Sequence, residues 1–79
     1  DSFAQRVELI EILDLLSFYA QQYRGITKRG IEALSWKLQG MSISEIAYAL
    51  QIPPSHVGAW ISKAKSALRR NPEFKQTIL

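Results

Sequence analysis

Apolar residues recur every three or four positions along most of this chain, and glycine or proline interrupts the pattern at short intervals. The interruptions fall at Gly25, at Gly40, at Pro53–Pro54 and at Asn71–Pro72. This spacing is typical of α-helices separated by short turns. No segment shows the alternation of a half-buried strand. The sequence therefore predicts an all-α fold of four to five helices.

A chain of 79 residues has room for one hydrophobic core. We therefore expect a single domain over residues 1–79, with a long N-terminal helix over 2–24, a three-helix core over 26–70 and a tail over 71–79. No apolar stretch approaches the roughly 20 residues of a membrane span, and no signal peptide is visible. The chain has no cysteine and one histidine, His56, so disulfides, thiolate metal sites and histidine relays are excluded. We expect a cytoplasmic domain without a metal or cofactor.

The first helix has two apolar strips. Ser2 and Gln5 have the spacing of a capping box, and Gly25 is the expected end of the helix. One stripe about 120° wide suits a face packed on a core; its members are Leu9, Ile12, Leu13, Leu16, Tyr19, Ala20 and Tyr23. A second strip, interleaved with acidic residues, lies outside that stripe; its members are Phe3, Val7, Ile10, Leu15 and Phe18. These five are candidate interface residues for another protein or a second copy of the chain. The alternative is that they are scattered surface residues or are covered by another part of a longer protein.

Start and stop signals divide the rest of the chain into three helices. Thr27 is a candidate cap for a helix that runs to about Gln39, where Gly40 supplies a left-handed stop. Ser42 and Glu45 form a capping box before the next helix. Pro54 suits the first turn of the last helix, because its missing N–H has no partner there. The inward positions of these last two helices are Ile46, Ala47, Leu50, Val57, Ile61, Ala64 and Leu68.

Charge is unevenly distributed along the chain. Residues 1–25 carry two basic and four acidic side chains, a net charge of −2, whereas residues 26–79 carry eight basic and three acidic side chains, a net charge of +5. A basic section favours a nucleic-acid partner over an acidic protein. The alternative is an ordinary solvated surface, since the excess is modest.

The run of residues from Gly40 to Val57 carries a family resemblance. It reads GMSISEIAYALQIPPSHV and resembles the motif Gly-x-Ser-x-x-Glu-Ile-Ala-x-x-Leu-x-Ile-x-x-x-x-Val of sigma-factor region four and of LuxR/FixJ-type regulators. Ile26–Thr27 and Glu32–Leu34 resemble the preceding helix of both families, and the basic ending Lys63–Arg70 is closest to the sigma-like group. The resemblance covers residues 26–70 and leaves the long first helix unexplained. It implies a helix-turn-helix domain that binds double-stranded DNA.

The resemblance also implies roles for individual segments. The helix of about Pro54–Arg70 would enter the major groove, and the helix of Ser42–Leu50 would brace it across the phosphates. The candidate DNA-binding residues are Ser42, Ser44, Ser55, His56, Ala59, Ser62, Lys63, Lys65, Arg69 and Arg70. Pro54, Gly58 and Ala59 stand where the sigma-like family commonly has polar side chains for base edges, and they form no bidentate pair. We therefore expect contacts to phosphates to outweigh base recognition.

Several alternatives stay open at the level of sequence. His56 and Ser55 also suit a helix start without a binding role, and the four cations suit a solvated last turn. Trp60 and Trp36 suit either packing at the edge of the core or an aromatic anchor for another chain. The second function we consider is a sigma-like helix-turn-helix that serves as a protein-interaction or dimerisation module and docks on RNA polymerase or another transcription protein. No catalytic constellation is visible, so we do not expect an enzyme.

Overall fold

The fold consists of four α-helices and a C-terminal helical turn. The computed structural model describes residues 2–74, and for residues 2–7 it describes the backbone only. The helices are α1 (Ser2–Ala20), α2 (Gly25–Leu38), α3 (Ile43–Leu50) and α4 (Pro54–Arg69). The backbone of residues 72–74 is again helical, and residues 2–74 contain no strand. The prediction of an all-α domain of four to five helices is confirmed.

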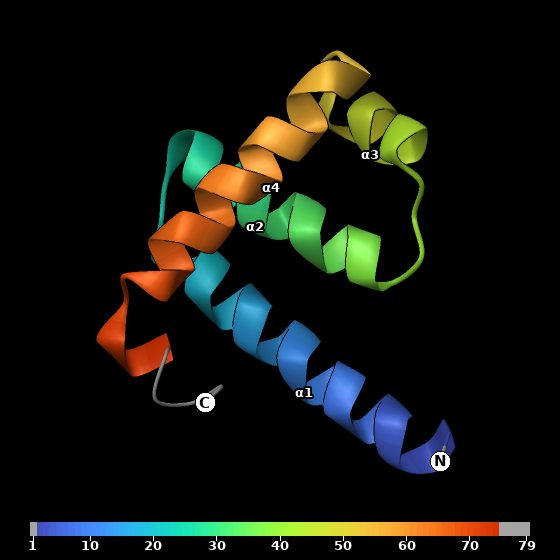
Figure 1. The fold of residues 1–79 in the computed structure, drawn as a ribbon, viewed down its shortest axis with the longest axis vertical. Coiled ribbons are helices and arrows are strands. Elements are labelled where there is room, and N and C mark those ends of the chain that lie inside the picture. Colours follow the sequence, from blue (N-terminus) through green and yellow to red (C-terminus); the bar gives the residue numbers. More distant parts are fainter. Residues whose placement is uncertain (1, 75–79) are drawn as a thin grey trace.

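Helix α2 lies at the centre of the arrangement, because α1, α3 and α4 all pack on it. Figure 1 shows α4 crossing α2 and the N-terminal half of α1 pointing away from the other helices. Within residues 2–74, no helix is both long enough and apolar enough to cross a bilayer.

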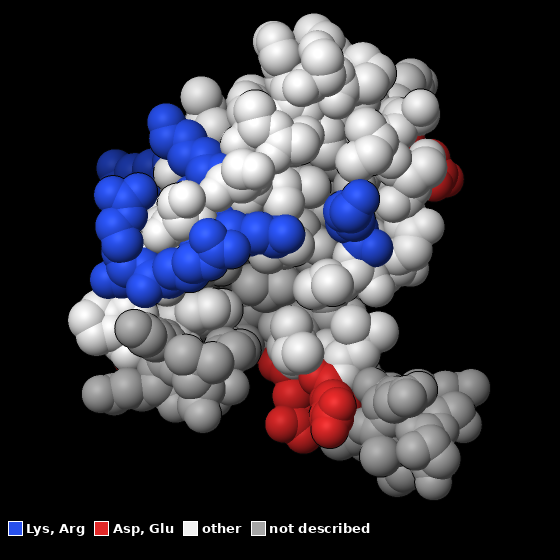
Figure 2. All heavy atoms as spheres, viewed as in Figure 1, with Lys and Arg blue, Asp and Glu red and all other residues white. Residues whose placement is uncertain are grey.

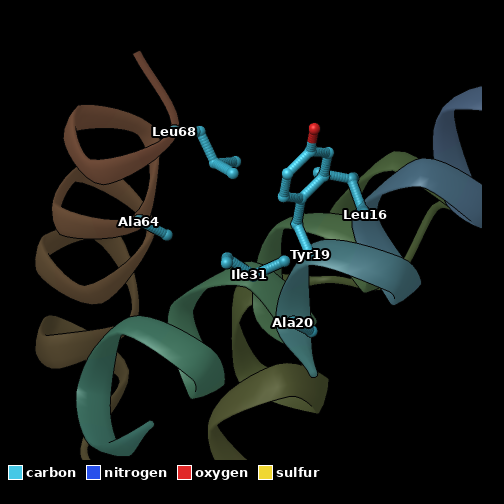
Figure 3. Close-up of a cluster of buried hydrophobic side chains, with 6 residues drawn as sticks. All are labelled: Leu16, Tyr19, Ala20, Ile31, Ala64 and Leu68. Atoms are coloured by element: carbon cyan, nitrogen blue, oxygen red, sulfur yellow. The ribbon is translucent and has the colours of Figure 1, made fainter. Parts of the chain in front are cut away.

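The core consists of two adjoining clusters. The first joins α1, α2 and α4 (Figure 3) and contains Leu16, Tyr19, Ala20, Ile31, Ala64 and Leu68. The second joins α2, α3 and α4 and contains Ala33, Ile46, Ala47, Leu50, Val57 and Ile61. Leu34 packs against both clusters. The seven inward positions predicted for α3 and α4 are all buried, which confirms the helical register of this half of the chain.

Left-handed residues end α2 and α3. Gly40 has φ +99°, and it donates its N–H to the Lys37 carbonyl (3.0 Å) while Met41 donates to the Trp36 carbonyl (3.1 Å). These two bonds form a Schellman motif and confirm the predicted stop. Gln51 has φ 58° and ends α3 in the same way, with its successor Ile52 donating to the Ala47 carbonyl at 3.0 Å. The left-handed conformation of Gln51 could not be predicted from the sequence, because a residue other than glycine has a steric cost in that region.

The boundary between α1 and α2 differs from the prediction. Helix α1 ends at Ala20, not near residue 24, and the chain continues in a turn where the Gln22 N–H donates to the Tyr19 carbonyl at 2.9 Å. Gly25, with φ +65°, begins α2 and does not end α1. Thr27 therefore lies inside α2, and Arg24 stands at the N-cap without a side-chain capping bond. The helical period of the apolar residues continues through this turn because Tyr23 is half-buried against the first cluster from a non-helical position.

The inner stripe of α1 is buried only in its C-terminal half. Leu16, Tyr19 and Ala20 are buried, whereas Ile12 is 38% exposed, because α1 extends past the helix on which it packs. Leu15, predicted on the outer strip, is half-buried against the first cluster. The Ser2–Gln5 capping box and the tail beyond Phe74 lie outside the side chains that the structure describes.

The segment after α4 folds back toward α1. The Asn71 side chain donates to the Tyr23 hydroxyl (3.2 Å) and accepts from the backbone N–H groups of Glu73 (3.0 Å) and Phe74 (3.2 Å). Asn71 thus caps the last helical turn and ties it to the turn after α1. The Phe74 ring stands edge-on to the Tyr19 ring with centroids 5.3 Å apart, so Phe74 covers the end of α1.

Candidate nucleic-acid interface

Helices α3 and α4 are joined by residues 51–53, and their relative position is fixed by the second core cluster. Ile46 and Ala47 of α3 pack in this cluster with Val57 and Ile61 of α4. Because these inward residues are fixed, the remaining positions of both helices face solvent or flank the core. This pair of helices is the segment for which the family resemblance implies DNA contacts.

All ten candidate DNA-binding side chains are exposed. They are Ser42, Ser44, Ser55, His56, Ala59, Ser62, Lys63, Lys65, Arg69 and Arg70. Exposure makes contact with a ligand sterically feasible, but the ten residues have different properties. From residue 54 to residue 62, α4 presents only small or neutral side chains and His56; three of the four cations lie in its second half and Arg70 is its C-cap.

The capping box at the start of α3 engages Ser42. The Ser42 hydroxyl accepts from the Glu45 N–H (3.1 Å), and the Ser42 N–H donates to Glu45 Oε1 (2.8 Å). The bonds from the Ser42 backbone N–H and then from its hydroxyl lower the pKa of the Glu45 carboxyl below its ordinary value. Glu45 therefore places a negative charge at the start of α3, where it favours the helix dipole and opposes a phosphate.

Basic residues gather where the start of α2 meets the second half of α4. Two contacts bracket this region: Tyr23 is hydrogen-bonded to Asn71, and Gly30 lies against Ala64. Segment 24–29 therefore runs beside segment 64–70. Both segments contain basic residues and no Asp or Glu, and Lys63 adds a further cation directly before the second segment. We call the surface of residues 24–29 and 63–70 the basic seam; its cations are Arg24, Arg29, Lys63, Lys65, Arg69 and Arg70, whereas Lys28 lines the groove between α1 and α2.

Figure 2 shows the same concentration of charge. Lys and Arg atoms gather over the region where Figure 1 places the start of α2 and the second half of α4, while the acidic atoms in this view lie elsewhere. Arg24 and Arg29 are exposed, and Lys28 is half-buried beside the groove between α1 and α2. Sequence reasoning missed Arg24 and Arg29 as candidates, because only the crossing of α2 and α4 brings them beside the basic end of α4.

The corner formed by residues 46–62, from α3 after Glu45 to the first half of α4, carries no formal charge. Residues 46–62 contain no Lys, Arg, Asp or Glu. At this corner Tyr48 is 88% exposed, and it lines a shallow, open groove with Ala49, Pro53 and Pro54. The uncharged run of residues 46–62 can be read from the sequence, but the exposure of Tyr48 is visible only in the fold.

The candidate protein-interface residues fall into three groups. Ile10 is 59% exposed and Phe18 is 51% exposed, so an apolar part of α1 faces solvent. Leu15 and Trp60 are half-buried and pack against the core clusters, as does Trp36. Edge packing therefore accounts for both tryptophans and for Leu15. The side chains of Phe3 and Val7 lie outside the described part of the chain.

The described residues contain no group of three or more His, Cys, Asp or Glu side chains that could hold a metal ion. The ten candidate DNA-binding residues present exposed hydroxyl, imidazole and cationic groups, which offer hydrogen bonds and positive charge, and the methyl group of Ala59. No protein-family model, curated protein or solved structure gives a significant match to this chain.

Proposed function

We propose that this chain is the DNA-binding domain of a bacterial transcription regulator or sigma-like factor and acts in the cytoplasm. The observation that carries the proposal is the position of four exposed cations in the second half of α4 and at its C-cap, where α4 follows a short helix and a three-residue connection; they are Lys63, Lys65, Arg69 and Arg70. The resemblance of residues 26–70 to sigma-factor region four supports the same function. Cations on one helix attract the phosphates of a duplex and release its counterions.

A salt titration tests this proposal. Binding of the chain to a random duplex and to candidate promoter duplexes is measured by fluorescence anisotropy from about 50 to 200 mM salt, the range over which phosphate contacts dominate the change in affinity. We expect the logarithm of the affinity to fall linearly with the logarithm of the salt concentration. Absence of binding to every duplex at the lowest salt concentration contradicts the proposal.

The uncharged corner favours a second candidate function, a protein-interaction module. Tyr48 is the most exposed of the large apolar residues described; residues 46–62 contain no Lys, Arg, Asp or Glu, and Glu45 lies one helical turn before Tyr48. Aromatic residues are enriched at the centre of protein interfaces, where charged residues are depleted. For this corner we propose RNA polymerase or another transcription protein as the partner. For the exposed apolar surface of α1, we propose a homodimer that forms through Ile10 and Phe18.

A further inference from the structure

We infer that the duplex lies along the basic seam and contacts it through phosphates, while the uncharged corner of α3 and α4 stays outside the groove. This inference rests on the proposed function and specifies which surface performs it. It differs from the mode that the family resemblance implies, in which the first half of α4 enters the major groove.

The first step of the argument is the amount of charge on each surface. The seam combines cations from two helices, and neither of its segments contains an acidic residue. The corner has no cation between residues 46 and 62, and its nearest acidic residue is Glu45, whose lowered pKa keeps it ionised. Since phosphate contacts supply most of the sequence-independent affinity for DNA, a duplex gains far more from the seam than from the corner.

The second step is geometric. The contact of Gly30 with Ala64 and the hydrogen bond between Tyr23 and Asn71 hold the two seam segments side by side at both ends. Arg29 on α2 and Lys63, Lys65 and Arg69 on α4 are thus held on one surface by packed helices, and Arg24 and Arg70 lie at the caps of the same two helices. A preorganised surface loses little conformational entropy when it binds.

The third step concerns the side chains at the corner. The outward positions in the first half of α4 include Ser55, Gly58 and Ala59, which have at most one hydrogen-bonding group each. Bidentate pairs with base edges provide most direct discrimination between sequences, and these residues form none. A duplex held at the seam through phosphates is therefore bound without strong sequence preference.

The test compares two exposed cations of the same helix. Arg29→Ala removes a charge from the seam, and Lys37→Ala removes one from the other end of α2. We expect Arg29→Ala to weaken binding to all duplexes by the same factor and to lower the salt slope by about one. We expect Lys37→Ala to leave the slope unchanged. Equal effects of the two substitutions contradict the inference.

A second pair of variants tests the position of the corner. Ala59→Glu places a negative charge at the exposed centre of the first half of α4, and Ala59→Gln is the neutral control. If the corner stays outside the groove, Ala59→Glu changes the affinity by at most about twofold relative to Ala59→Gln at physiological salt, because screening weakens distant charges. A loss of binding with Ala59→Glu alone means that α4 enters the groove, which overturns the inference and leaves the proposed function intact.

The parent chain separates failure of the inference from failure of the function. Binding that depends on Lys63 and Arg70 but not on Arg29 supports the proposed function and overturns the seam. A parent chain that binds no duplex at any salt concentration overturns both. Circular dichroism of each variant checks that the helices are intact.

Discussion

The α-carbon of Gly30 in α2 lies directly against the backbone carbonyl of Trp60 in α4. A Cβ atom at residue 30 would overlap that carbonyl oxygen and would lie 2.9 Å from the Cβ of Ala64. Gly30 is buried and has no positive φ, so the absence of a side chain is required by the close approach and not by the backbone conformation. This contact sets how closely the two central helices cross, and it holds the start of α2 beside the basic end of α4.

Gly30→Ala should therefore destabilise the domain. Overpacking typically costs about 1–3 kcal/mol, and here the obstacle is backbone that has little freedom to move. Alanine gains about 1 kcal/mol of helix propensity over glycine, which offsets part of this cost. Because the obstacle is backbone, we expect a cost near the upper end of that range and a net loss of about 2 kcal/mol in the free energy of unfolding, measured by urea denaturation. Unchanged stability would show that the helices separate without cost at this crossing.

Gly58→Ala is the matched control and a prediction of its own. Gly58 lies inside α4 with no positive φ and with open space around the position of a Cβ atom. Only the helix propensity changes there, so we expect the domain to become more stable by about 0.5–1 kcal/mol. A thermal melt of the two variants side by side measures the opposite signs. A loss of stability at residue 58 would mean that this surface is covered by something, for example a second copy of the chain.

Ala47→Leu should cost about 1–3 kcal/mol by overpacking the second core cluster. Ala47 is 4% exposed and packs with residues of α4, so a larger side chain has no space without moving one of the two helices. Ala49→Leu, at an exposed position of the same short helix, controls for the change in propensity. Denaturant midpoints of the two variants are compared with that of the parent, and equal midpoints for all three would be inconsistent with this packing.

The capping box of α3 should make stability depend on pH in the acidic range. The folded pKa of Glu45 is lowered by its bonds from Ser42, so its contribution is fully present above the ordinary carboxyl pKa of 4.5. That contribution is lost as the pH falls through the lower folded pKa. Thermal midpoints across this range should decline less for Glu45→Gln than for the parent. Ser42→Ala should cost about 1 kcal/mol at neutral pH, the usual effect of removing an N-cap.

Lys63→Ala combined with Arg70→Ala should weaken binding to all duplexes about equally and flatten the salt slope by about one unit for each lost phosphate contact. Both side chains are exposed, so the fold should be preserved. The measurement is the same salt titration that tests the proposed function. If the double variant binds as tightly as the parent over the whole salt range, α4 does not carry the contacts.

Local chemistry was enough to determine most of the helices from the sequence alone. The capping box at Ser42, the left-handed Gly40 and the first-turn Pro54 act over a few residues, so their effects are independent of the rest of the chain. The inward faces of α3 and α4 were predictable for a similar reason. Apolar residues that recur with the helical period of 3.6 residues form one stripe, and that stripe faces the core whatever the arrangement of the other helices.

The tertiary structure decided what depends on residues far apart in the sequence. Helix α1 ends at Ala20, earlier than the sequence predicts, because Tyr23 packs against and hydrogen-bonds with the segment after α4. The helical period of the sequence does not indicate this contact. Ile12 stays exposed because α1 is longer than the surface beneath it, and Leu15 is half-buried because the first cluster reaches it. The basic seam exists because Gly30 lets α4 approach α2 closely, which brings Arg24 and Arg29 beside cations about 40 residues later in the chain. Packing between distant segments has no local signature, so charge on this surface could be counted in the sequence but placed only in the fold.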